Sequence, residues 1–142
     1  MPINETPKDK ERERKFGAYL ATLWRCAMAE LPQFYEIDFA AVRDRKVLSM
    51  VEVKCRKYEM HHFKTCILSM HKYAALRRVI RIHPDITAIF AVRWLDGDGY
   101  FVVGEEDELD LEWEGRTDRG SQSDLEPCVK IPIDLFQKLG AK

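Results

Sequence analysis

The feature that most constrains this chain is a pair of β-rich segments within residues 35–56, separated by the polar run Asp44-Arg45-Lys46. Apolar residues recur in both segments, and this pattern around a short polar break predicts a β-hairpin with a three-residue loop. Because side chains alternate between the two faces of a strand, one face of this hairpin is almost wholly apolar. The other face is apolar near the loop and carries four ionisable side chains at its far end: Glu36, Asp38, Glu52 and Lys54.

These four side chains oppose one another if the two strands pair symmetrically about Arg45. Asp38 then faces Glu52, and Glu36 faces Lys54. Opposed carboxylates are destabilising on an antiparallel pair, by roughly 3 kcal/mol at about 5 Å and an effective dielectric constant of about 20. A fold keeps that arrangement when a positive charge lies between them, and a divalent cation or the Lys54 ammonium can supply it. Oxygen ligands on a rigid strand pair favour Mg²⁺ or Mn²⁺ over zinc.

Ile37-Asp38, followed after the loop by Glu52-Val53-Lys54, resembles the Asp…Glu-x-Lys motif of the PD-(D/E)XK nuclease superfamily. That superfamily includes type II restriction enzymes, archaeal Holliday-junction resolvases and many phage nucleases. The sequence departs from the family pattern at Ile37, where proline is frequent, and the resemblance covers residues 9–95. It implies that Asp38, Glu52 and Lys54 are catalytic. It also implies that Asp38, Glu52 and the backbone carbonyl of Val53 bind Mg²⁺ or Mn²⁺.

A first helix is predicted over residues 9–30, where apolar residues recur at intervals of three and four and Asp9 is a suitable N-cap. In the resembled superfamily this helix often supplies one more acidic residue to the metal site. Glu13 begins the run Glu-Arg-Lys-Phe-Gly-Ala-Tyr-Leu, which is similar to a run seen in junction resolvases, and Glu11 is a close competitor. A solvated acidic first turn, with neither glutamate in the site, is an equal alternative.

A second helix is predicted over residues 62–82, followed by a buried strand at residues 86–94 that runs parallel to a neighbour in the same sheet. The resemblance implies that this helix packs beside the site, where Ser69 and Lys72 are secondary candidates for contact with phosphate or metal-bound water. The alternative places both on the solvent side of an amphipathic helix. Glu36 is a third secondary candidate, either paired with Lys54 or in the metal shell.

The charge of the chain is unevenly distributed. Residues 1–83 contain 17 Lys and Arg against 10 Asp and Glu, whereas residues 84–142 contain 6 against 14. A basic first part fits contact with a phosphate backbone, and the alternative is a charge-mixed surface without a role. DNA is the expected partner, with candidate contacts at Arg56, Lys57, Arg77 and Arg78. Arginines at the end of a helix also complement the helix dipole, which is an equal explanation of the last two.

The C-terminal part is predicted to be mainly strands. The run Asp96-Gly97-Asp98-Gly99 predicts a turn, and residues 100–103 a return strand. The acidic residues 105–114 predict an edge strand with one apolar face. A polar loop at 115–126, a short strand at 127–132 and a short closing helix at 133–139 complete the chain.

Together these elements predict an α/β fold with a restriction-endonuclease-like core, in which a central mixed β-sheet is flanked by helices in the order α-β-β-α-β-β. Residues 1–8 are expected to be a flexible N-terminal tail, and residues 9–142 a single nuclease-like domain. The superfamily core has three strands before its second helix, and the sequence shows only two. Either the first of the three strands is absent, or residues 33–43 supply both the first and the second strand.

Several classes of protein are excluded by what the sequence lacks. No segment approaches 18 apolar residues and the N-terminus has no apolar signal region, so a cytoplasmic protein without membrane contact is expected, in the host cytoplasm if a phage encodes it. Four cysteines without C-x-x-C spacing predict reduced thiols, and His62 with Cys66 makes only a weak zinc alternative. No small-molecule cofactor is expected. Superfamily members of this size are often homodimers, so the resemblance implies a homodimer as one possibility, without independent support from the sequence.

The expected function is Mg²⁺-dependent hydrolysis of DNA phosphodiester bonds. A small chain without an added recognition domain favours a structure-specific or weakly sequence-specific nuclease, in recombination, repair or phage DNA processing. One alternative is a catalytically silent nucleic-acid- or protein-binding module that retains the nuclease fold. Another is a partner-binding α/β domain in which the four ionisable side chains form a buried ion-pair network.

Overall fold

Two β-sheets and two helices form the framework of the protein. The computed structural model describes residues 6–105, 107–115 and 125–140, with side chains placed except at 113–115 and 125. Along the chain the elements are α1 (Pro7–Trp24), β1 (Ala27–Glu30), β2 (Phe39–Arg43), β3 (Lys46–Cys55), β4 (Thr65–Ser69), α2 (Met70–Ile82), β5 (Thr87–Trp94), β6 (Gly97–Val102), β7 (Asp110–Gly115), β8 (Leu125–Pro132), a 3₁₀-helix (Ile133–Leu135) and β9 (Gln137–Leu139).

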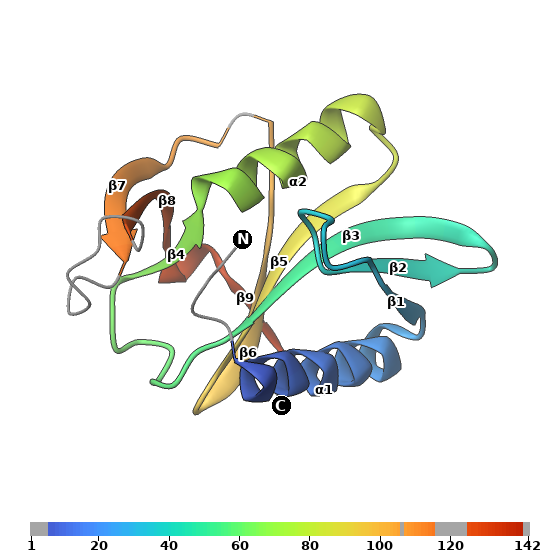
Figure 1. Cartoon of the computed structure of the whole chain (residues 1–142), viewed down its shortest axis with the longest axis horizontal. Coiled ribbons are helices and arrows are strands. Elements are labelled where there is room, and N and C mark those ends of the chain that lie inside the picture. Colours follow the sequence, from blue (N-terminus) through green and yellow to red (C-terminus); the bar gives the residue numbers. More distant parts are fainter. Residues whose placement is uncertain (1–5, 106, 116–124, 141–142) are drawn as a thin grey trace.

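The larger sheet has six strands in the order β1-β2-β3-β5-β6-β9, and the smaller one has the order β4-β8-β7. Within the described residues β3 and β5 pair in parallel, and the other strand pairs are antiparallel. In Figure 1, α1 runs along one side of the large sheet and α2 along the other, with the small sheet beside the start of α2. The α/β fold and the mixed central sheet are therefore confirmed.

The alternation of side chains along β3 explains why helices cover both faces of the sheet. Val51 and Val53 are fully buried in a core with Phe16 and Leu20 of α1. The opposite face of the sheet forms a second core with α2 and the small sheet, centred on residues such as Phe90. A sheet that buries both of its faces needs a covering layer on each side.

The hairpin has the expected register at its open end and a different loop. Ala41 lies opposite Ser49, as symmetric pairing requires, but Arg43 pairs with Lys46, so the loop is the two residues Asp44 and Arg45. Both loop residues have positive φ, 52° and 66°, as a type I′ turn demands. The expected three-residue loop is wrong. A bulge between Ala41 and Val42 restores the register toward the open end.

The first helix is shorter at its C-terminal end than predicted, and this is where the missing strand lies. The helix begins at Pro7, with Thr6 rather than Asp9 as N-cap, and ends at Trp24 before Arg25, which has φ 55°. β1 follows and pairs antiparallel with β2. The helical spacing continued into β1 only by coincidence, because pairing with β2, a contact distant in sequence, overrides local propensity. Three strands of the large sheet, β1, β2 and β3, therefore precede α2.

Two further elements were predicted wrongly. The first five residues after Lys64 form β4, which pairs with β8, so the second helix starts at Met70 and not near residue 62. The predicted closing helix is a 3₁₀ turn followed by β9, which pairs with β6. The acidic edge strand is present as β7, at one edge of the small sheet, although it begins at Asp110 and Leu111 on it is 58% exposed. Residues 1–5 of the expected tail and 116–124 of the expected loop lie outside the described residues.

Candidate active site

The large sheet opens at the far end of the hairpin. β2 pairs with β3 up to Phe39, which lies opposite Val51, and before Phe39 the chain turns away from β3. Asp38 closes this point: its Oδ2 accepts a hydrogen bond from the Val53 backbone N–H at 3.0 Å, and its carbonyl accepts one from Leu31 N–H at 2.9 Å. The side chain of Asp38 thus takes the place of the next rung of the strand ladder, and a pocket forms beside it.

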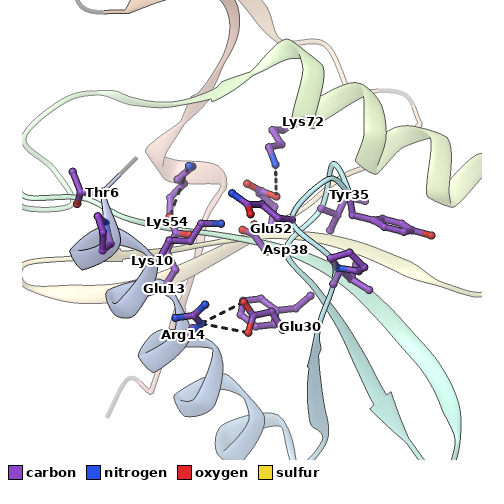
Figure 2. A pocket seen from close by; sticks show the side chains of 16 residues that line it. Thr6, Lys10, Glu13, Arg14, Glu30, Tyr35, Asp38, Glu52, Lys54 and Lys72 are labelled. Carbon is purple, nitrogen blue, oxygen red and sulfur yellow. Dashed lines mark hydrogen bonds and ion pairs between the residues drawn. The ribbon is translucent and has the colours of Figure 1, made fainter. Parts of the chain in front are cut away.

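This pocket has a volume of about 460 Å³ and is lined by six parts of the chain. They are the first turns of α1, the end of β1, the loop of residues 31–38, the start of β2, β3 and the first turn of α2. Figure 2 shows the ionisable side chains that project into it: Lys10, Glu13, Arg14, Glu30, Asp38, Glu52, Lys54 and Lys72. The structure therefore gathers the three motif residues and Glu13 in one cavity.

Glu52 is the most deeply buried ionisable residue of the pocket, with 1% of its surface exposed. Its Oε1 has no hydrogen-bond partner among the described residues, and the nearest cation is the Lys72 ammonium at 3.6 Å. Burial, followed by the nearby Asp38 carboxylate, raises the pKa of Glu52 to about 8, against the opposing effects of Lys72 and Lys54. At its deepest point the pocket therefore holds two neighbouring carboxyl groups, whose mutual repulsion Lys72 and Lys54 offset only in part.

Helix α1 brings Glu13 to the pocket and leaves Glu11 outside it. Glu13 is 8% exposed and its Oε2 lies 3.8 Å from the Lys54 ammonium, whereas Glu11 is exposed and does not line the pocket. Gly17, one turn further along α1, allows this close packing, since a Cβ there would come within 2.9 Å of the Phe39 ring. The sequence did not decide which of the two glutamates joins the site. The structure does, because the two residues point to different sides of α1 and only Glu13 faces the pocket.

Helix α2 contributes Lys72 through its first turn. The Ser69 hydroxyl accepts a hydrogen bond from the Lys72 backbone N–H at 3.2 Å and so forms the N-cap of α2. Lys72 projects from that turn into the pocket, and its side chain is 17% exposed. Ser69 does not line the pocket and helps to position the turn that carries Lys72.

Glu36 and the arginines predicted for nucleic-acid contact lie outside the pocket. Glu36 pairs with His71 at 2.9 Å and with Arg78 at 3.4 Å, on the outer side of α2, and is not paired with Lys54 in any contact observed. Arg77 donates to the Glu105 carbonyl and lies over the Tyr73 ring.

Arg56 and Lys57, which directly follow the motif in the sequence, also lie outside the pocket. Arg56 donates to the Ile67 carbonyl at 2.7 Å and ties β3 to β4. Lys57 is exposed. Both residues follow Lys54 closely in the sequence, but the strand carries them past the pocket rather than into it.

Three charged residues that line the pocket were not singled out from the sequence. Lys10 and Arg14 extend from α1 beside Glu13, and Arg14 pairs with Glu30 at the end of β1, at 3.3 Å. The spacing of Lys10, Glu13 and Arg14 puts all three on one side of a helix, so this signal was present. Glu30 lacked any such signal, because its strand was taken for helix.

The donor set of this pocket suits a hard cation. Asp38 and Glu52 offer carboxylate oxygens and Glu13 offers a third, whereas Val53 is fully buried, does not line the pocket and is tied to Asp38 through its N–H. In the described part of the chain no three His, Cys, Asp or Glu side chains are grouped closely enough to enclose an ion by themselves. Mg²⁺ is commonly held by one or two carboxylates, with waters and substrate phosphates completing its shell. An acid pair with one unpartnered buried oxygen fits that mode of binding.

The fold and the pocket define the class of this protein: an α/β protein of restriction-endonuclease-like architecture, with an acid pair and lysines where the sheet opens. The model of the family described as "Phage putative PDDEXK endonuclease" matches residues 1–139, and the chain belongs to this family. The resemblance noted in the sequence is confirmed. Enzymes of this superfamily generally use divalent metals, and an endonuclease acts on nucleic acid. No curated protein matches the chain.

Neither described helix has the length and apolar character needed to cross a membrane.

Proposed function

We propose that this protein is a Mg²⁺-dependent nuclease that hydrolyses DNA phosphodiester bonds. The observation that carries the proposal is the carboxyl of Glu52, which is almost fully buried beside Asp38 with one oxygen lacking a hydrogen-bond partner. Leaving a buried polar group unsatisfied costs about 1–3 kcal/mol, and more for a charged one. A purely structural carboxylate would be hydrogen-bonded, so an oxygen whose nearest cation is the Lys72 ammonium at 3.6 Å favours a site built to receive a further cation.

The residues that would hold the ion are Asp38, Glu52 and the Val53 carbonyl, with Glu13 as a further ligand. Mg²⁺ fits these oxygen donors, and Mn²⁺ is the alternative. When bound, such an ion polarises a phosphoryl oxygen and lowers the pKa of water.

Two lysines of the pocket contribute to the proposed reaction directly. Lys54 lies within 3.8 Å of Glu13, whose carboxylate holds the ammonium over the pocket. We propose that Lys54 orients the attacking water and stabilises the negative charge that develops on the phosphate oxygens. Lys72 provides a second ammonium on the α2 side, 3.6 Å from Glu52, that contacts the phosphate once the cation is bound.

Cleavage of a labelled panel of DNA substrates tests this proposal. Duplex, single strand, flap and four-way junction are incubated with Mg²⁺, Mn²⁺ or EDTA, beside the same sequences in RNA. We expect metal-dependent cutting that is lost in Asp38→Asn, because that change removes a charged ligand and keeps its shape. Binding without cutting would favour the alternative of a silent module that retains the fold. Cutting that persists in EDTA would contradict the proposal.

Mg²⁺ is expected to raise the Tm of the wild-type protein. A ligand that binds only the folded state stabilises it by about 2.7 kcal/mol at a hundred times its Kd. Because Glu52 must lose its proton to bind a cation, and its pKa is about 8, the rise should increase with pH across the neutral range. Differential scanning fluorimetry measures it. Asp38→Asn should lose most of the rise and the exposed control Glu59→Gln should keep it; a rise that survives in Asp38→Asn would place the ion elsewhere.

A further inference from the structure

The loop between β1 and β2 presents two aromatic side chains to solvent at the edge of the pocket. Phe34 is 86% exposed and Tyr35 is 51% exposed. Their ring centroids lie 6.2 Å apart with a 40° tilt between the ring planes. Tyr35 also lines the pocket, and Figure 2 shows its ring on the side away from α1, pointing outward. The pair is thus an exposed aromatic surface that continues directly from the pocket wall.

The loop that carries this pair is anchored to the site. Its ends are joined by the hydrogen bond from Leu31 N–H to the Asp38 carbonyl, and Tyr35 N–H donates to the Pro32 carbonyl at 2.8 Å. Asp38 follows Tyr35 by three positions, which limits the distance between their Cα atoms to about 10 Å. Successive nucleotides of one strand rise about 3.4 Å each. A strand with a phosphate at Asp38 can therefore bring one of its next few bases to the aromatic pair.

We propose that Phe34 and Tyr35 form a stacking site for an unpaired nucleobase of the strand whose phosphate occupies the pocket. This inference rests on the proposed nuclease function and names its substrate class: DNA that carries unpaired nucleotides beside the cleaved bond. Base–aromatic stacking is tolerant of sequence because every base has a π-face. Within a duplex each base face is covered by its neighbours in the stack, so a paired base inside a duplex cannot occupy this site.

Two observations favour a nucleobase over a second copy of this chain as the occupant. Tyr35 belongs to the wall of the pocket, so a protein surface seated on the pair would cover the opening through which substrate must enter. The pocket is also lined by the cations Lys10, Arg14, Lys54 and Lys72, beside the carboxylates that would hold the metal ion. A polyanion that carries flat apolar rings matches cations on one side and aromatic faces on the other.

Binding of fluorescein-labelled oligonucleotides, measured by anisotropy in EDTA so that no cutting occurs, tests the inference. The anisotropy probes are a single strand and a duplex of the same length. A second set of single strands carries 2-aminopurine at successive positions and reports stacking through quenching. Phe34→Ala and Phe34→Leu should weaken single-strand binding about tenfold, the order of one lost base–aromatic stack, and leave duplex binding unchanged. Tyr35→Phe keeps the ring and should keep the affinity. Quenching of 2-aminopurine should occur with wild type and disappear in Phe34→Leu.

Several results would overturn the inference. Phe34→Leu could bind and quench as wild type does, or the variants could lose affinity for both probes equally. A change in sedimentation without a change in single-strand binding would assign the pair to a contact between copies. If wild type cuts duplex with metal and the Phe34 variants cut every substrate equally well, this inference fails and the proposed function stands. If wild type neither binds nor cuts any nucleic acid, the proposed function itself fails.

Discussion

Glu52→Gln is expected to unfold at higher urea concentration than wild type at about pH 8, and to cut no DNA. The change removes the negative charge and keeps the shape of the side chain, which is 1% exposed. Burial beside Asp38 disfavours the ionised carboxyl, so the folded protein is less stable when Glu52 is charged. Loss of activity would follow from the loss of a proposed metal ligand, and the gain in stability from the loss of a buried charge that Lys72 offsets only in part.

The direction of the pH dependence follows from proton linkage. The pKa of Glu52 is about 8 in the folded state and 4.5 in its unperturbed form, so the folded protein holds a proton that the unfolded chain has released. The unfolded state binds fewer protons in this window, and wild-type stability therefore falls as pH rises from about 4.5 to 8. The full effect is on the order of 5 kcal/mol. The glutamine variant should lose none of this stability.

Urea unfolding in EDTA at several pH values between these limits measures the difference. Glu59→Gln is the matched control, because it makes the same substitution at an exposed position and should follow the wild-type profile. The prediction is contradicted if wild type and Glu52→Gln show equal pH dependence, or if the glutamine variant is less stable at about pH 8. Either result would mean that the ionised Glu52 carboxyl does not destabilise the folded protein.

Lys54→Ala is expected to lower the rate of DNA cleavage by about 10²–10³, the typical cost of removing one group that stabilises developing charge. The effect should fall on kcat more than on DNA binding, because the ammonium acts most strongly when charge accumulates on the phosphate. Single-turnover cleavage with Mg²⁺ separates the two quantities. Lys54→Arg should recover little, since a planar guanidinium does not replace a compact ammonium.

Lys57→Ala provides the control for Lys54→Ala. Lys57 lies three residues further along, is exposed and does not line the pocket. Its removal subtracts the same charge from the protein and should lower cleavage only slightly, through long-range attraction of DNA. Equal losses in both variants would assign Lys54 to general electrostatic attraction and would remove it from the proposed mechanism.

The local parts of the fold were predictable because they depend on neighbours in the sequence. The hairpin register near Asp38 and Glu52 follows from the alternation of apolar residues, and a one-residue slip would have buried the charged face against α1. The helix on each face and the parallel β3–β5 pair follow from the order of the elements. The contact between Glu13 and Lys54 does not follow in this way, because Lys54 alternates with Val51 and Val53, the residues of β3 that pack against α1.

The mispredicted elements depend on partners distant in the sequence. β1, β4 and β9 are each short, and each exists through pairing with a strand placed elsewhere in the chain. Residues 27–30 continue the helical spacing of α1, and their composition does not indicate a strand. Arg56 and Arg77 likewise bond to carbonyls of other elements, so their chemistry as basic residues did not reveal their surroundings.

The sequence by itself determined the chemistry of the site, because the spacing of Asp38, Glu52 and Lys54 on a hairpin places an acid pair and a lysine together whatever surrounds them. Tertiary structure alone decided how that chemistry is enclosed. It placed Glu13 and Lys72 in the pocket from two different helices, and it set Tyr35 in the pocket wall with the exposed Phe34 ring beside it. The reason is physical: alternation along a strand is a local geometric property, whereas burial depends on which distant segments pack together.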